Sequence, residues 1–383
     1  MKVIYLDNHA TTPCDPRVLQ AMLPYFTEFF GNPSSSLHQP GRKAAQAVEH
    51  ARGQVAELIG AKPGEIVFTS GASESNNLAI FGVAEAYRGE RQRIVTTPIE
   101  HKAVLEPFRQ LTRGGFEAVF LPVDARGRVD LEAAQQVIDD RTLLVSVQAA
   151  NNEIGTIQPV PEIAALAHRC GALVHCDAAQ AVGKIPLDVG SWDVDLLSIS
   201  AHKLYGPKGV GALYVAQGLK KTALQPQILG GGQESGLRSG TLNVPGIVGL
   251  GEACEIARVS MPEESRRISR LRDAFESGLR AVIPGIRVNG DLENRLPGNS
   301  SITFPDIEAD ALLLNMPHVA LSMGSACNAG AIEPSYVLTS IGLSRDLAHS
   351  TVRIGWGRFN QEDDVATALA CLSEAYSRLV ALA

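Results

Sequence analysis

Two stretches, "ALVHCDAAQ" (residues 172–180) and "VDLLSISAHK" (194–203), decide the fold. Each starts as a run of apolar residues and ends in polar or ionisable ones, as a buried strand does where it leads into a site. Similar runs precede them, namely "EIVFTSG" (65–71), "RIVTTPIEH" (93–101) and "RTLLVSVQAANNEIG" (141–155). Helical patterns lie between the runs, and the first of them starts at about Ser75. This alternation predicts an α/β fold with a mostly parallel sheet that is flanked by helices on both faces.

The composition is that of an ordinary globular α/β protein. The chain has 383 residues, 45% of them hydrophobic, and a net charge of −7. This acidic balance argues against direct binding to nucleic acid. No apolar run approaches the roughly 20 residues that span a membrane, and the start "MKVIYLDNHATT" lacks signal-peptide architecture. The six cysteines follow no framework spacing, so we expect a cytoplasmic protein with reduced thiols and no membrane partner.

After roughly Glu252 the pattern changes. A charged helix is expected over 262–283, followed by short strands and a final helix. The strand-like segments are "GIRVNG" (285–290), "SSITF" (300–304) and "STVRIGWGRF" (350–359). This order indicates a second, smaller α+β domain.

The polar residues of interest gather where the predicted strands end. These ends read "TSGASES", "PIEHK", "AANNEIG", "CDAAQ" and "SAHKLYG". Because ligands of parallel sheets bind beyond the carboxyl ends of the strands, one common site is expected there.

Lys203 and Asp177 together point to a specific cofactor. A lone lysine after a strand is usually a surface residue, but Asp177 ends a neighbouring buried strand, where a carboxylate needs a cation or a donor. Pyridoxal phosphate needs this pair: an amine to bind covalently, and a carboxylate that keeps the ring nitrogen protonated.

A phosphate-binding turn supports the same cofactor. Gly71, Ala72 and Ser73 open a helix, whose free backbone N–H groups and dipole favour an anion. Ser200 and His202, just before the lysine, add donors within reach.

At this point the sequence resembles the class V, fold-type I pyridoxal-phosphate enzymes, and among them the cysteine desulfurases of the NifS/IscS kind. The resemblance covers nearly the whole chain. It rests on "YLDNHATT", "GNPSS", "TSGASESNN", "IEHKAVL", "NNEIGTIQP", "HCDAAQAVGK", "SAHKLYGPKGVGALYV", "GGGQESGLRSGTLNVPGIVG", "GSAC", "EPSYVL" and "HSTVRIGWGRF". It implies a large cofactor-binding domain over 15–254, and a small domain over 1–14 and 255–383 that carries a catalytic cysteine loop.

The resemblance also implies roles for the residues that match its motifs. Lys203 would hold the cofactor, Asp177 would pair with the ring nitrogen, and Gln180 would donate to the phenolic oxygen. His101, which by itself would read as a hydrogen-bonded loop histidine, would stack on the ring and act as acid and base. The phosphate would be bound by Ala72, Ser73, Ser200, His202 and, from the neighbouring subunit of a homodimer, Thr241.

Cys327, in "LSMGSACNAGAI" (321–332), matches the family's nucleophile. Its small neighbours could not fill a core, and they suit a backbone that must move or be approached closely. Asn152 and Arg353 would bind the carboxylate of the substrate L-cysteine. The thiolate of Cys327 would then take the substrate sulfur as a persulfide and leave L-alanine.

Other readings stay open. A selenocysteine lyase or a C–S lyase without an enzyme persulfide would not need Cys327. An aminotransferase or a decarboxylase of the same fold would release no alanine, and a degenerate binding protein would not hold the cofactor. A metal site in "HRCGALVHC" (168–176) is not expected, because His168 and Cys170 diverge on a helix, and His175 and Cys176 point to opposite sheet faces.

Departures from the family pattern bear on the sulfur acceptor. The sequence departs from the usual family pattern at His9, Met323, Asn328 and the stretch "RIGWGRF" (353–359). The chain also stops at "RLVALA" without the C-terminal extension of housekeeping members. We therefore expect the sulfur to go to a dedicated acceptor protein. Among the pathways that use such enzymes we favour DNA phosphorothioation over transfer RNA thiolation and over general iron–sulfur assembly.

Overall fold

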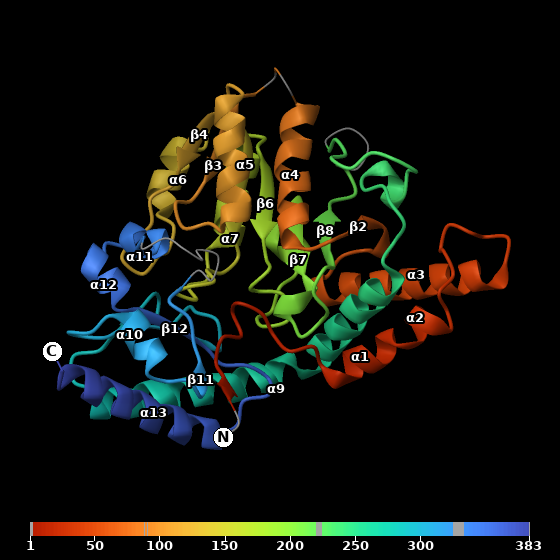
Figure 1. Cartoon of the computed structure of the whole chain (residues 1–383). Coiled ribbons are helices and arrows are strands. Elements are labelled where there is room, and N and C mark those ends of the chain that lie inside the picture. The colour runs from red at the N-terminus through yellow and green to blue at the C-terminus, as the bar shows by residue number, and fades with distance from the viewer. Residues whose placement is uncertain (1–2, 88, 90, 220–223, 325–332, 383) are drawn as a thin grey trace.

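The computed structural model describes residues 3–87, 89, 91–219, 224–324 and 333–382. A larger part is built on a wide sheet, and a smaller part beside it contains both ends of the chain (Figure 1). The long helix α9 (Val244–Val282) runs along both parts and joins them.

Within the described residues the large sheet has seven strands, in the order β2-β8-β7-β6-β5-β3-β4. Their bounds are β2 Ile66–Thr69, β3 Arg93–Thr96, β4 Glu117–Phe120, β5 Thr142–Gln148, β6 Leu173–Asp177, β7 Leu196–Ser200 and β8 Gly211–Val215. β8 runs antiparallel to its neighbours β2 and β7, and the remaining pairs are parallel. The carboxyl ends of all strands except β8 therefore lie at one edge of the sheet.

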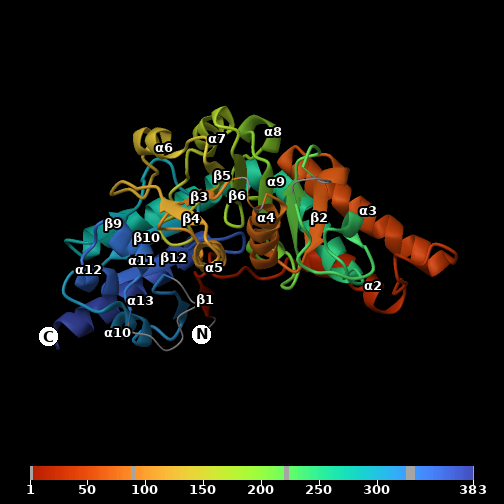
Figure 2. The same ribbon diagram turned by 90° about the horizontal axis from the view of Figure 1, so that it is seen from above.

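Helices cover both faces of this sheet, and each face has its own apolar core. On one face α4 (Ala72–Ala86) and α5 (Lys102–Arg113) pack Ile80 and Phe108 against the strands (Figure 2). The other face is covered by α9 and by α3 (Gln39–Ile59), α6 (Leu131–Val137), α7 (Val160–Arg169) and α8 (Val189–Trp192). The predicted α/β architecture is confirmed, although α4 begins three residues before the expected Ser75.

The smaller part has a separate apolar core around Phe275, Phe304 and Trp356. Within the described residues its main sheet has the order β12-β10-β9, with antiparallel pairing. A short parallel pair joins β1 to β11 and so ties the N-terminus to this part. The elements are β1 Ile4–Tyr5, β9 Arg287–Asn289, β10 Asn299–Thr303, β11 Val319–Ala320, β12 Thr351–Gly355, α10 Ala309–Leu314, α11 Tyr336–Ser340, α12 Arg345–His349 and α13 Glu362–Val380.

The helix expected over 262–283 is longer than predicted. α9 starts at Val244 and includes Pro262 as an internal residue, although proline favours the first turn of a helix. Ala257 still belongs to the core of the large part, whereas Ile268 belongs to the core of the small part. The change from one core to the other therefore falls inside one continuous helix.

Two short helices, α1 (Pro16–Met22) and α2 (Pro24–Thr27), follow the N-terminal strand and lie beside α9. They leave large apolar side chains exposed, among them Leu19, Leu23 and Phe26. In the described residues, no helix is both long enough and apolar enough to cross a bilayer.

Candidate active site

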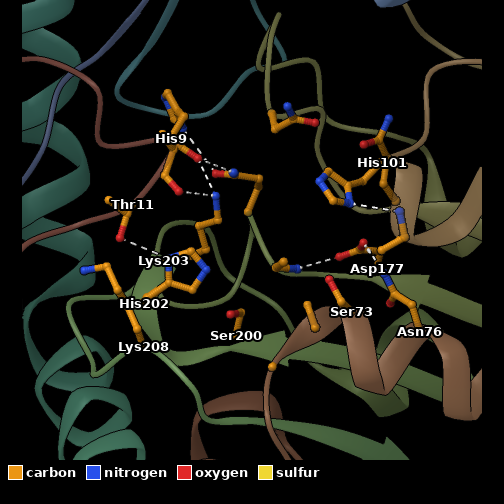
Figure 3. A pocket seen from close by; sticks show the side chains of 18 of the residues that line it. His9, Thr11, Ser73, Asn76, His101, Asp177, Ser200, His202, Lys203 and Lys208 are labelled. Carbon is orange, nitrogen blue, oxygen red and sulfur yellow. Dashed lines mark hydrogen bonds between the residues drawn. The ribbon is translucent and has the colours of Figure 1, made fainter. Parts of the chain in front are cut away.

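A cavity of about 500 Å³ lies at the carboxyl ends of the strands of the large sheet. Its wall contains residues from all five strand ends that the sequence singled out. Lys203 and His202 lie on one side of this cavity, and Asp177 and His101 lie on the other (Figure 3). The site is therefore assembled by the parallel strands, as expected for this sheet type.

Lys203 ends the single turn η2 (Ala201–Lys203), which follows β7 directly. Its Nζ donates to the main-chain oxygens of His9, at 2.6 Å, and Ala10, at 2.8 Å. The N-terminal segment thus holds the lysine amine at the wall of the cavity, where Figure 3 shows it pointing inward.

Asp177 is the last residue of β6 and is 7% exposed. One carboxylate oxygen accepts from Nδ2 of Asn76 at 2.7 Å, and the other accepts from the backbone N–H of Ala179 at 3.0 Å. Burial of a carboxylate is costly without such donors. Sequence reasoning missed Asn76, which lies on α4 one turn after Ala72 and Ser73 and therefore faces the same way.

The N-terminus of α4 forms the floor of the cavity. Its N-cap residue, Gly71, has φ 149° and supplies no side-chain cap, so the first backbone N–H groups of the helix stay available to an anion. A Cβ built on Gly211 would lie 2.6 Å from the Cα of Gly71. This close approach of two glycines brings β8 against the start of α4.

Ser200 and His202 lie beside this helix end. A Cβ built on Gly71 would lie 3.8 Å from Oγ of Ser200. Nδ1 of His202 contacts Oγ1 of Thr11 at 3.1 Å. Burial, together with the charges of Lys203 and Lys208, lowers the pKa of His202 to about 4. A neutral imidazole at this position can offer its other ring nitrogen to a ligand.

His101 is the N-cap of α5, where its Nδ1 accepts from the backbone N–H of Ala103 at 3.1 Å. This bond assigns the ring proton of neutral His101 to Nε2. Burial lowers the pKa of His101, although the Asp177 carboxylate opposes the shift. The ring is therefore neutral at pH 7 and can exchange a proton with a group in the cavity.

Arg353 comes from the other side of the site, on β12 of the smaller part. Its neighbours Val352 and Ile354 belong to the apolar core, and its own side chain reaches the cavity. Nη1 donates to the main-chain oxygen of Asn152 at 3.1 Å, and Nη2 donates to Oδ1 of Asp7 at 2.8 Å. Asp7 is a partner that sequence reasoning did not identify.

Gln180 also lines the cavity. Its Nε2 donates to the main-chain oxygen of His9 at 2.9 Å, and its Oε1 accepts from Nζ of Lys184 at 2.9 Å. Of the other expected residues, Thr241 is exposed and does not line the cavity. Cys327 lies outside the described residues.

The two histidines of the "HRCGALVHC" stretch contact different partners. His168 contacts Asp193 and Asp195, and His175 contacts Ser146 and Ser198. No group of potential metal ligands is present in the part of the chain that the structure describes.

These features fit pyridoxal phosphate. The cavity combines a lysine amine, a buried carboxylate with its own donor, and an uncapped helix start. The amine would attach the cofactor covalently, the carboxylate would pair with its ring nitrogen, and the helix start would bind its phosphate.

Comparisons with known proteins agree with this reading. Residues 4–367 match the family described as Aminotransferase class-V. The chain is 50% identical over 380 residues to the cysteine desulfurase IscS of Anaeromyxobacter dehalogenans (strain 2CP-C), which covers 99% of this chain and 94% of the relative.

Solved structures are similar over the same length. A NifS-like protein superposes with a TM-score of 0.92 at 41% identity, over 98% of this chain and all of that chain. SspA in complex with cysteine superposes with a TM-score of 0.83 at 39% identity, over 94% of this chain and all of that chain. The chain therefore belongs to the class V aminotransferase family and, within it, to the pyridoxal-phosphate-dependent cysteine desulfurases.

Proposed function

We propose that this cysteine desulfurase converts L-cysteine to L-alanine by passing the substrate sulfur to Cys327. The observation that carries the proposal is the placement of Lys203 and Asp177 on opposite sides of one cavity, with Arg353 at its wall (Figure 3). The structure of SspA with cysteine supports the same ligand for this cavity.

Each residue has a separate task in this proposal. Lys203 holds the cofactor, Asp177 pairs with its ring nitrogen, and the start of α4 with Ser200 and His202 binds its phosphate. When bound, pyridoxal phosphate draws electrons from the α-carbon of an amino acid into its ring. His101, neutral at pH 7, stacks on the ring and carries the proton that the α-carbon loses.

Arg353 and Asn152 orient the substrate. A guanidinium group binds a carboxylate with two parallel hydrogen bonds. Because Nη1 and Nη2 of Arg353 already contact Asn152 and Asp7, these two residues fix the plane of the guanidinium group. We infer that substrate binding redirects at least one of these contacts.

Sulfur removal requires a nucleophile. The Cys327 thiolate attacks Sγ of the substrate, an S–S bond forms, and the C–S bond of the substrate breaks. The products are a persulfide on Cys327 and L-alanine, so no external oxidant or reductant is consumed in this half of the reaction.

The test is a Cys327→Ser variant, with Cys371→Ser as a matched control for the loss of a thiol. The variant should retain the visible absorbance of the cofactor and still bind L-cysteine, but it should form no alanine and should carry no extra sulfur on the peptide that contains residue 327. Near-normal alanine formation would favour the lyase reading, in which no enzyme persulfide forms.

We also propose that the enzyme is a homodimer. Exposed large apolar side chains occur in and after α1 and α2 and in the segment that leads to Thr241: Leu19, Leu23, Phe26, Phe30, Leu37, Ile228 and Leu229. Where such side chains gather on a surface, they often mark an interaction face. They lie on the large part, where a partner subunit would supply Thr241 to the phosphate.

The sulfur would then pass to an acceptor protein. Met323 is 39% exposed and precedes the nucleophile by four positions, so it offers a contact that differs from the family pattern. Following labelled sulfur from L-cysteine into proteins of the native cell would identify the acceptor, and transfer only to a general iron–sulfur scaffold would refute a dedicated route such as DNA phosphorothioation.

We retain the predicted division into 15–254 and 1–14 with 255–383. The two separate apolar cores and the β1–β11 pair support it. A cytoplasmic location stays a prediction from the scattered, unpaired cysteines.

A further inference from the structure

The side-chain amide of Gln180 has a single orientation that satisfies its neighbours. One end faces the main-chain oxygen of His9, which can only accept, and the other end faces Nζ of Lys184, at 2.9 Å in each case. The N–H group must therefore point to His9 O, and Oε1 must point to Lys184.

This orientation also determines the tautomer of His9. Nδ1 of His9 lies 3.2 Å from Oε1 of Gln180, which is an acceptor, so Nδ1 carries the proton. His9 is 2% exposed, and burial lowers its pKa well below the usual value. The imidazole is thus neutral and donates to the same oxygen that Lys184 contacts.

The main-chain oxygen of His9 connects this arrangement to the cofactor lysine. It accepts from Nε2 of Gln180 and also from Nζ of Lys203, at 2.6 Å. A shift of the main chain at residue 9 would therefore change a hydrogen bond of Gln180 and one of Lys203 at the same time. Figure 3 shows His9 close to the lysine amine.

Two further departures from the family pattern adjoin His9. A Cβ on Gly355 would lie 2.9 Å from Cδ2 of His9, so a residue larger than glycine would press on the imidazole. Trp356 lines a small cavity of about 20 Å³ together with His9 and Lys184. The residues at 9, 355 and 356 therefore form one packed unit behind the cofactor cavity.

Lys184 is suited to this place in either charge state. Burial, followed by the charges of Lys203 and Arg353, lowers its pKa to about 7, although Glu264 opposes the shift. Both the ammonium group and the neutral amine carry N–H groups, so Lys184 can donate to Gln180 above and below that pH.

We propose that Lys184 and His9 are positioning residues that jointly hold the Gln180 amide so that its second N–H group, the one that does not donate to His9 O, can reach the cofactor. The inference rests on the proposed contact between Gln180 and the phenolic oxygen of the cofactor. If either donor is lost, Oε1 keeps only one partner, so the amide is held less firmly and its N–H group aligns less well with the phenolic oxygen. The phenolic oxygen then loses a hydrogen-bond donor, and its negative charge is less stabilised.

The test measures the pH at which the visible absorbance of the substrate-free holoenzyme changes. Lys184→Met and His9→Leu should each raise this midpoint by about 0.5 to 1 pH unit, as expected for one weakened hydrogen bond. His9→Leu removes no charge, so its shift separates the loss of a donor from the loss of a nearby positive charge.

Two variants serve as matched controls. His9→Asn keeps a side-chain N–H group close to the position of Nδ1 and should restore a near-native midpoint. Lys62→Met removes an exposed contact of the same kind, between Nζ of Lys62 and Oε1 of Gln217 at 3.4 Å, and should leave the midpoint unchanged.

Gln180→Leu distinguishes failure of this inference from failure of the proposed site. This variant removes the amide without adding a charge and should raise the midpoint, and adding His9→Leu to it should produce little further change. A shift with Gln180→Leu but none with Lys184→Met and His9→Leu would overturn the positioning roles alone. No shift with Gln180→Leu would refute the contact between Gln180 and the cofactor, and the inference with it.

Discussion

Asn76 shows how a neutral side chain can hold the buried Asp177 carboxylate in place. Its Nδ2 lies 2.7 Å from Oδ2 of Asp177, and both residues are buried. Because Asn76 carries no charge, it orients the carboxylate without neutralising it. The geometry therefore fixes the direction in which the carboxylate that we propose for the ring nitrogen can accept a further hydrogen bond.

We expect Asn76→Ala to weaken the affinity for pyridoxal phosphate by roughly tenfold to a hundredfold, because a hydrogen bond to a charged group contributes about 1.5–3 kcal/mol. Fluorescence titration of the apoenzyme with the cofactor measures this change. Asn77→Ala is the control, since Asn77 is only half-buried and its Nδ2 donates to the Ser73 carbonyl within the same helix. Equal affinities of the two variants would contradict the role of Asn76.

The residues of the site were unequally predictable. Lys203 and Asp177 stood out because an ionisable residue at the end of a buried strand needs a chemical reason. Asn76 gave no such signal, because asparagine on a helix is ordinary until the fold shows which strand end it faces. Asp7 was missed for the same reason, because its partner Arg353 is far away in the sequence. Lys184 contacts Gln180 only four positions away, but a lysine at that spacing gave no reason to single it out.

At the scale of elements, one histidine ties a helix to a strand. His168 lies in the last turn of α7, and its two ring nitrogens contact Asp193 at 2.9 Å and Asp195 at 2.8 Å, just before β7. Burial lowers the pKa of His168, but the hydrogen bonds and charges of the two aspartates outweigh this effect and raise it above 6.5. The folded protein therefore binds this proton more tightly than the unfolded chain does.

Because the pKa of His168 is higher in the folded protein than in the unfolded chain, protonated His168 adds to the free energy of unfolding. This contribution is fully present below the pKa of the unfolded chain, and it is lost as pH rises through the pKa of the folded protein. We expect His168→Asn to lower the melting temperature at pH 6, and the difference from the unchanged protein to shrink as pH rises above 6.5. Thermal unfolding at several pH values measures it, with His318→Asn, at an exposed position, as the control. A difference that stays constant with pH would contradict the charged interaction.

The elements themselves were predicted well where their pattern is long and buried. β5, β6 and β7 are buried along nearly their whole length, so their apolar runs were clear. β4 is a half-exposed edge strand and β1 has only two residues. Neither shows a recognisable alternation of apolar and polar residues. The start of α9 was misplaced because proline is typical of a helix start in sequence alone, whereas here the helix continues through Pro262 and packs into a core on either side of it.

On the scale of the whole molecule, the site is incomplete in one chain if Thr241 belongs to it. Thr241 is exposed and does not line the cavity of its own chain. Large apolar side chains are exposed on α1, on α2 and in the segment before Thr241, which is where we propose that a second copy binds. The two observations together favour a dimer in which each subunit completes the phosphate site of the other.

A mixture of two inactive variants tests this arrangement. Lys203→Ala removes the cofactor lysine, and Thr241→Ala should weaken the phosphate site, so each homodimer should have little activity at low cofactor concentration. In a mixed dimer with shared sites, one cavity combines the intact Lys203 of one chain with the intact Thr241 of the other. Unfolding and refolding the two variants together should therefore restore activity, up to about one native site per mixed dimer.

Each variant refolded alone is the control, and sedimentation velocity verifies the dimer. If Thr241 acted within its own chain, every cavity of the mixed dimer would lack one of the two residues, and activity would stay at the level of the separate variants.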